Sequence, residues 1–85
     1  MKWYENLSIE KNILILAYEE QVVTSETVQD LLTNVSHAYA SNLLKKLWGD
    51  ELLSRKKINL TEGGFRYQYK TTSKGIYQIK DIISQ

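Results

Sequence analysis

Residues 36–55 read SHAYASNLLKKLWGDELLSR, and a change of period within this stretch decides the fold. The apolar residues at helical offsets of 0, 3, 4 and 7 are Ala40, Leu43, Leu44 and Leu47. This spacing predicts a helix over about 36–48 with Ser36 as its N-cap. After Gly49 and Asp50 the helical period is lost, so the helix is expected to end there.

The next segment alternates in a period of two, which is typical of strands. Ile58 and Leu60 alternate with polar residues, and the second half contains an alternating aromatic series, namely Phe65, Tyr67 and Tyr69. Between the two halves lies a glycine-bearing turn at 61–64, which predicts a β-hairpin. We expect the aromatic residues to pack on the inner face of the hairpin rather than to stack on unpaired bases.

Three more elements surround this pair. An amphipathic pattern predicts a helix from Leu7 to Gln21, followed by a very short strand at 22–24. Ser25 is a candidate N-cap for a short helix over 26–32, and Thr72 or Ser73 begins a last helix over about 73–84. The prediction is therefore an α+β winged helix-turn-helix fold, one domain over 1–85. It has a three-helix core, a two-stranded β-hairpin wing over about 53–71 and a C-terminal helix.

Two stretches resemble the MarR-like and related small prokaryotic transcriptional regulators, bacterial or archaeal. The first is 36–55, and the second is Tyr69-x-Thr71-Thr72-x-x-Gly75, which is similar to the end of the wing in those families. The chain departs from the pattern at Glu51, where glycine is usual, and at Thr71, where leucine is common. The resemblance implies a DNA-binding regulator whose outer helices pair two subunits.

Composition excludes several other classes. The chain has no cysteine and one histidine, which removes thiol chemistry and most metal sites, so we expect no cofactor and no metal. It has no glycine-rich phosphate loop and no recognisable catalytic pair, so we expect no enzyme. It also has no apolar run long enough for a membrane span and no signal peptide, which predicts a cytoplasmic protein.

Charge is distributed unevenly along the chain, although its formal net value is only +1. Residues 1–35 contain two Lys and Arg against six Asp and Glu, a net charge of −4. Residues 36–85 contain nine Lys and Arg residues and four Asp and Glu residues, which gives a net charge of +5. A basic C-terminal part favours double-stranded DNA as the partner.

The candidate DNA-binding residues lie on the helix over 36–48 and on the wing. Those of the helix are Ser36, His37, Ala38, Tyr39, Ser41, Asn42, Lys45 and Lys46, and those of the wing are Arg55, Lys56, Lys57, Arg66, Gln68 and Lys70. The helix would read base edges in the major groove, and the wing would contact flanking backbone or the minor groove. The alternatives are a solvated helix face, an edge hairpin kept soluble by charge, and a salt bridge from Arg55 to Asp50 or Glu51.

A homodimer is expected because a short chain has little other surface with which to cover its outer apolar residues. The candidate interface residues are Trp3, Tyr4, Leu7, Ile76, Ile79, Ile82 and Ile83. The alternative is that the last helix folds back on the first.

The function expected from all of this is sequence-specific transcription regulation. The alternatives are a winged-helix protein-interaction module and a non-specific DNA-coating protein of the chromatin type.

Overall fold

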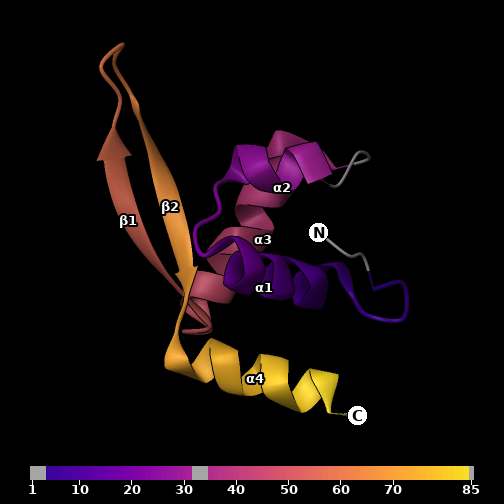
Figure 1. Cartoon of the computed structure of the whole chain (residues 1–85). Coiled ribbons are helices and arrows are strands. Elements are labelled where there is room, and N and C mark those ends of the chain that lie inside the picture. The colour runs from indigo at the N-terminus through magenta and orange to yellow at the C-terminus, as the bar shows by residue number, and fades with distance from the viewer. Residues whose placement is uncertain (1–3, 32–34, 85) are drawn as a thin grey trace.

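The computed structural model describes residues 4–31 and 35–84. Its elements in chain order are α1 (Ile9–Glu20), α2 (Ser25–Leu31), α3 (His37–Gly49), β1 (Leu53–Asn59), β2 (Phe65–Thr71) and α4 (Ser73–Ile83). Helices α1, α2 and α3 pack together, the hairpin stands beside them, and α4 lies under α1 (Figure 1). This is the predicted α+β arrangement.

Helix α1 forms the centre of the core. Its cap is Ser8, whose hydroxyl accepts from the Lys11 N–H at 3.2 Å, and residues 12–17 are all buried. One of them is polar: Asn12 is fully buried, and its amide group bonds to the backbone of the preceding segment, including both N–H and C=O of Tyr4. Asn12 therefore ties the start of the chain to the core.

The caps of α2 and α3 differ in how well the sequence predicted them. Ser36 caps α3 as expected, since its hydroxyl accepts from the Tyr39 N–H at 3.1 Å. The predicted cap of α2 is wrong by one residue: the hydroxyl of Thr24 accepts from the Thr27 N–H at 3.3 Å, and Ser25 is already helical. Thr24 is the cap rather than Ser25 because a second hydrogen bond supports it. The Thr27 hydroxyl accepts from the Thr24 N–H at 3.4 Å.

Strands β1 and β2 pair antiparallel in a register that runs from Leu53 opposite Thr71 to Asn59 opposite Phe65. The expected short strand is present as a single bridge, in which Val23 and Tyr69 exchange backbone hydrogen bonds of 2.8 and 3.0 Å. Tyr69 is buried, but the expectation of core packing for all three aromatics is wrong at Phe65, which is 51% exposed. The hairpin extends past the helices, so nothing covers its far end (Figure 1).

The turn between α3 and β1 is a Schellman motif. The N–H of Leu52 donates to the Leu47 carbonyl, and the N–H of Glu51 donates to the Trp48 carbonyl, both at 3.0 Å. Glu51 has a φ of 65° and so occupies the left-handed position that usually carries glycine. This is the site where the sequence departs from the family pattern, so the turn keeps its conformation without the glycine.

Helix α4 begins against this turn. The Thr72 hydroxyl accepts from the Gly75 N–H at 3.0 Å and donates to the Glu51 carbonyl at 2.6 Å. A Cβ on Gly75 would overlap the Leu52 carbonyl oxygen, so only glycine fits at that position without a shift of the backbone. Thr72 and Gly75, both from the motif at the end of the wing, therefore join α4 to the base of the wing.

The predicted interface residues divide between core and surface. Ile79 is 2% exposed within the single chain, so its assignment to the dimer interface is wrong, and α4 folds back on α1 at this point. Tyr4 and Leu7 are half-buried against the same core. Ile76 and Ile82 are half-buried, whereas Ile83 is 62% exposed. Trp3 lies outside the described residues.

Candidate nucleic-acid interface

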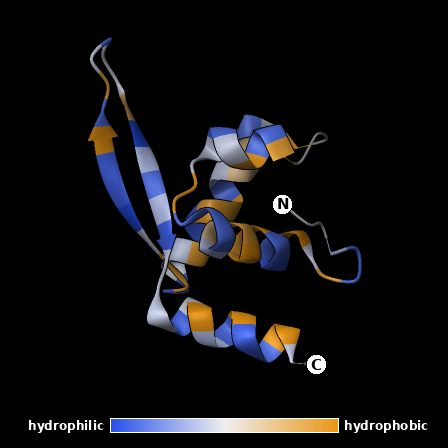
Figure 2. Ribbon diagram, in the orientation of Figure 1, coloured by the Kyte–Doolittle hydropathy of each residue, from blue (hydrophilic) through white to orange (hydrophobic). Residues whose placement is uncertain are grey.

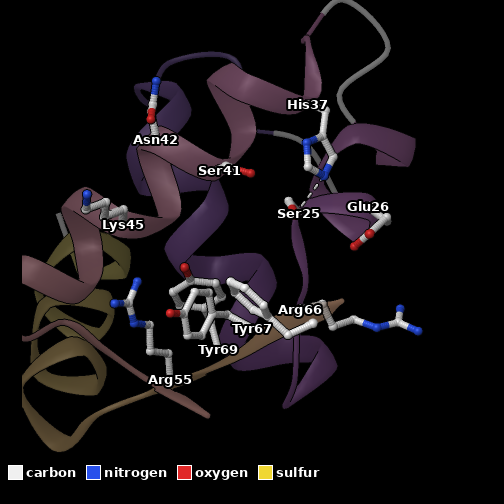
Figure 3. Close-up of a pocket in the computed structure, with 11 residues that line it drawn as sticks. Ser25, Glu26, His37, Ser41, Asn42, Lys45, Arg55, Arg66, Tyr67 and Tyr69 are labelled. Atoms are coloured by element: carbon white, nitrogen blue, oxygen red, sulfur yellow. Dashed lines mark hydrogen bonds between the residues drawn. The ribbon is translucent and has the colours of Figure 1, made fainter. Parts of the chain in front are cut away.

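A groove of about 290 Å³ separates the inner face of the wing from α2 and α3 (Figure 3). Its walls come from α2, α3 and the hairpin. Helix α2 contributes Ser25 and Glu26, and helix α3 contributes His37, Ser41, Asn42 and Lys45. The hairpin adds Arg55, Phe65, Arg66, Tyr67 and Tyr69. The fold thus brings predicted residues of the helix and of the wing, far apart in the sequence, to one site.

The exposed face of α3 carries the residues best suited to base edges. Tyr39 is 45% exposed, Asn42 and Lys45 are exposed, and Ser41 is half-buried beside the groove. The opposite face of the same helix, with Leu44 fully buried, anchors it in the core. The rigid packing of one face therefore holds the other in a fixed position.

Four other predicted helix residues have different surroundings. Ser36 uses its hydroxyl as the cap of α3, and Ala38 is exposed. The Nε2 of His37 lies 3.2 Å from the Ser25 hydroxyl, which links the starts of α2 and α3. Lys46 makes a salt bridge to Glu10 of α1 at 2.8 Å, and the carboxylate raises its pKa.

The basic residues of the wing lie on two faces. The outer face carries three residues of β2, namely Arg66, Gln68 and Lys70. Their cross-strand partners on β1 are Ile58, Lys56 and Ser54. Arg55 and Lys57 instead share the inner face with the aromatic residues, opposite Tyr69 and Tyr67. Both strands are largely hydrophilic along their length (Figure 2). Apart from Arg66, the wing residues that line the groove toward α3 lie on the inner face.

The inner-face cations contact aromatic rings. The guanidinium carbon of Arg55 lies 3.6 Å from the ring centroid of Trp48 and 4.0 Å from that of Tyr67. The Lys57 ammonium lies 4.3 Å from the centroid of Phe65. Arg55 therefore does not make the alternative salt bridge to Asp50 or Glu51 within the described part of the chain. Trp48 was not among the predicted site residues, because in the sequence it marks only the end of a helix.

The two ends of the groove differ in charge. Lys45 and Arg55 lie at one end, whereas Glu26 and Arg66 lie at the other (Figure 3). The pKa of Glu26 is held below its usual range by its own backbone N–H, then by the Thr24 hydroxyl and the charges of Arg66 and His37. Glu26 is therefore a carboxylate at neutral pH. It was not among the predicted site residues.

Within residues 4–31 and 35–84, none of the helices combines the length and apolar character that a membrane span requires.

Comparison with known proteins supports the fold. The chain is similar to a PadR-like transcription factor from Bacteroides fragilis, with a TM-score of 0.80 and 26% identity over 89% of this chain and 77% of that one. It is also similar to ZitR of Lactococcus lactis, a zinc-responsive MarR family member, with a TM-score of 0.71 and 23% identity over 98% of this chain. A ZitR mutant in complex with DNA gives a TM-score of 0.72 at 24% identity. The chain spans just over half the length of ZitR, 55% and 57% in these two structures.

No protein-family model and no curated protein matches the sequence. The similar solved structures named above are regulators of transcription rather than enzymes. They share the helix order and the hairpin described here, and they include the MarR family whose motifs the sequence resembles. The chain has a winged helix-turn-helix fold like that of PadR-like and MarR-family transcription factors.

Proposed function

We propose that this protein is a transcriptional regulator that binds specific sites on double-stranded DNA. The observation that carries the proposal is the continuity of the exposed face of α3 with the basic end of the groove. In this arrangement α3 enters the major groove, and the wing lies along the neighbouring backbone. A ZitR mutant, which has a similar fold, forms a complex with DNA, and this supports DNA as the partner.

The residues of α3 divide into two roles. Asn42 suits a bidentate bond to adenine, and Ala38 suits contact with a thymine methyl group. Lys45, whose ammonium has no carboxylate partner among the described residues, suits a backbone phosphate. Lys46 is less suited, because its charge is already paired with Glu10. We therefore assign the phosphate contact of α3 to Lys45 alone.

The experiment that tests this function measures binding to a duplex selected from a random pool and to unselected duplexes, each at two salt concentrations. A site-specific regulator should prefer the selected duplex by at least about a thousandfold. Equal binding to both would favour non-specific coating, and the absence of salt-dependent binding would favour a protein-interaction module.

Matched variants assign the roles. Asn42→Ala should cost about 1 to 3 kcal/mol on the selected site and leave non-specific binding nearly intact. Lys45→Ala should weaken binding to every duplex and reduce the slope of log K against log salt by roughly 1. The control is Lys11→Ala, which removes the same charge from an exposed position of α1, outside the groove. Identical effects of Asn42→Ala and Lys45→Ala on both DNAs would contradict the division of roles.

The regulator is proposed to act as a homodimer that pairs through α4. Tyr77 is 77% exposed and Ile83 62% exposed on this helix. On the neighbouring surface, Tyr18 of α1 and Ile76 line a common hollow, and Tyr18 is itself 50% exposed. A protein contact would cover these exposed apolar side chains. A two-fold dimer would present two copies of α3 to half-sites one helical turn apart.

Because Ile79 belongs to the core, the interface is tested at exposed positions instead. Tyr77→Asp combined with Ile83→Asp should give a monomer in sedimentation velocity and weaken DNA binding, although no groove residue changes. Gln78→Asp is the control, since it places the same charge at another exposed position of α4. A wild-type protein that sediments as a monomer at tens of micromolar would contradict the dimer.

A further inference from the structure

Arg55 occupies an unusual position at the base of the wing. It extends from β1, and its guanidinium contacts the Trp48 ring from the last turn of α3 and the Tyr67 ring from β2. Arginine stacks well on aromatic rings because its cation is planar and weakly hydrated. The side chain is half-buried, so three elements of the fold hold it in place.

The hydrogen-bonding capacity of Arg55 is not used by these contacts. Across residues 4–31 and 35–84, no carboxylate lies within 4.0 Å of Arg55, and no hydrogen bond is made by its five N–H groups. A guanidinium with free N–H groups is a good donor to phosphate oxygens, which it can bind in a bidentate manner.

The surroundings favour an anion at this end of the groove. Lys45, on α3, lies at the same end as Arg55, on β1, and the two residues line opposite walls there (Figure 3). The other end carries the Glu26 carboxylate beside the cation of Arg66, so these two charges offset each other and attract a phosphate less. The two ends together define which part of the groove a DNA backbone would occupy.

We propose that Arg55 is the principal phosphate-binding residue of the wing, and that Trp48 and Tyr67 are positioning residues that hold its guanidinium ready. This inference rests on the proposed function and adds to it an assignment of three residues. An arginine already ordered by stacking loses little rotamer freedom when it binds, which favours affinity. Trp48 and Tyr67 thus act through Arg55 and need not touch DNA.

The test uses the whole chain in a Trp3→Phe background, so that Trp48 is the single tryptophan. The binding constant of the selected duplex is measured at several salt concentrations for Arg55→Ala, Arg55→Lys, Trp48→Phe and Trp48→Leu. Lys11→Ala is the control for loss of a positive charge. Urea unfolding of each variant reports whether it folds.

Arg55→Ala should lower affinity about tenfold and reduce the salt slope by roughly 1, whereas Lys11→Ala should do neither. Arg55→Lys should keep the slope and lose part of the affinity, because lysine carries the charge without the planar stack. Trp48→Leu should lower affinity at an unchanged slope, and Trp48→Phe should restore most of it. Trp48 fluorescence should change when DNA binds, and this change should be lost in Arg55→Ala.

Two results would overturn the inference, and they are distinguishable. If the wild-type protein shows no salt-dependent binding to the duplex, the proposed function fails and the inference fails with it. If the wild-type protein binds but Arg55→Ala keeps the full slope, DNA binding stands and Arg55 only joins the wing to α3. Arg55→Lys and Trp48→Leu answer the same question should Arg55→Ala fail to fold.

Discussion

The two ends of the wing are built in different ways. At the base, β1 follows the α3 turn directly, Tyr69 is buried, and the Thr72 N–H donates to the Leu52 carbonyl at 3.1 Å. At the far end the chain turns through Gly63 and Gly64, both with positive φ, and Phe65 is half exposed. The base is part of the core, whereas the far end contacts little besides its own strands (Figure 1).

This difference shows what each end contributes. The base fixes the angle between the wing and α3, so it decides where Arg55 lies relative to Lys45. The far end carries Glu62 rather than a cation, which makes it a weak phosphate contact. The expectation of a basic wing therefore applies to its strands and not to its turn.

The largest expected effect compares two aromatic residues of β2. Tyr69→Ala should lower the free energy of unfolding by about 3 to 5 kcal/mol, because it removes a buried ring from the core. Phe65→Ala should lower it by less than about 1 kcal/mol, because half of its surface is already exposed. Urea unfolding followed by circular dichroism measures both. Equal losses would mean that the far end also packs on the core.

An intermediate effect concerns two glycines near the base. Gly75→Ala should destabilise the protein by about 1 to 3 kcal/mol, because its Cβ would meet the Leu52 carbonyl. Gly49→Ala is the matched control: a Cβ there meets no atom within 4 Å, and alanine favours the helix by up to about 1 kcal/mol. The two variants should therefore shift the urea midpoint in opposite directions.

The smallest effect concerns the left-handed residue of the α3 turn. Glu51→Gly should raise the free energy of unfolding by roughly 0.5 to 1 kcal/mol, because glycine adopts a positive φ without steric cost. Glu62→Gly, at the far end, removes the same charge where no positive φ is recorded and should not stabilise. Destabilisation by Glu51→Gly would show that the glutamate side chain stabilises the turn.

The periodic part of the fold was predictable from the sequence. Helical spacing from Ala40 to Leu47 reflects one buried face, and alternation from Phe65 to Tyr69 reflects one aromatic face of a strand. These two patterns led directly to α3 and β2, although only Tyr69 of the aromatic face is buried. The cap of α2 was missed because Thr24, Ser25 and Thr27 are all suitable residues, and only the reciprocal bond decides among them.

The sequence indicated which residues belong to the site, but it did not show which of them contact one another. Charge alone could not show that Lys46 pairs with Glu10, since the two are 36 residues apart, or that Arg55 stacks on Trp48. Ile79 was misassigned because an amphipathic stripe shows that a helix face is buried, without showing whether the same chain or another covers it.

The most direct test of the central claim is a map of the DNA contact on the protein itself. Amide chemical shifts of isotope-labelled protein would be followed while a selected duplex is added. The account expects the largest changes at Tyr39, Ser41, Asn42, Lys45 and Arg55, with amides near Lys80 on α4 little affected apart from any effect of dimerisation. Changes centred on α4, or none along α3 and the inner face of the wing while DNA binds, would contradict the account.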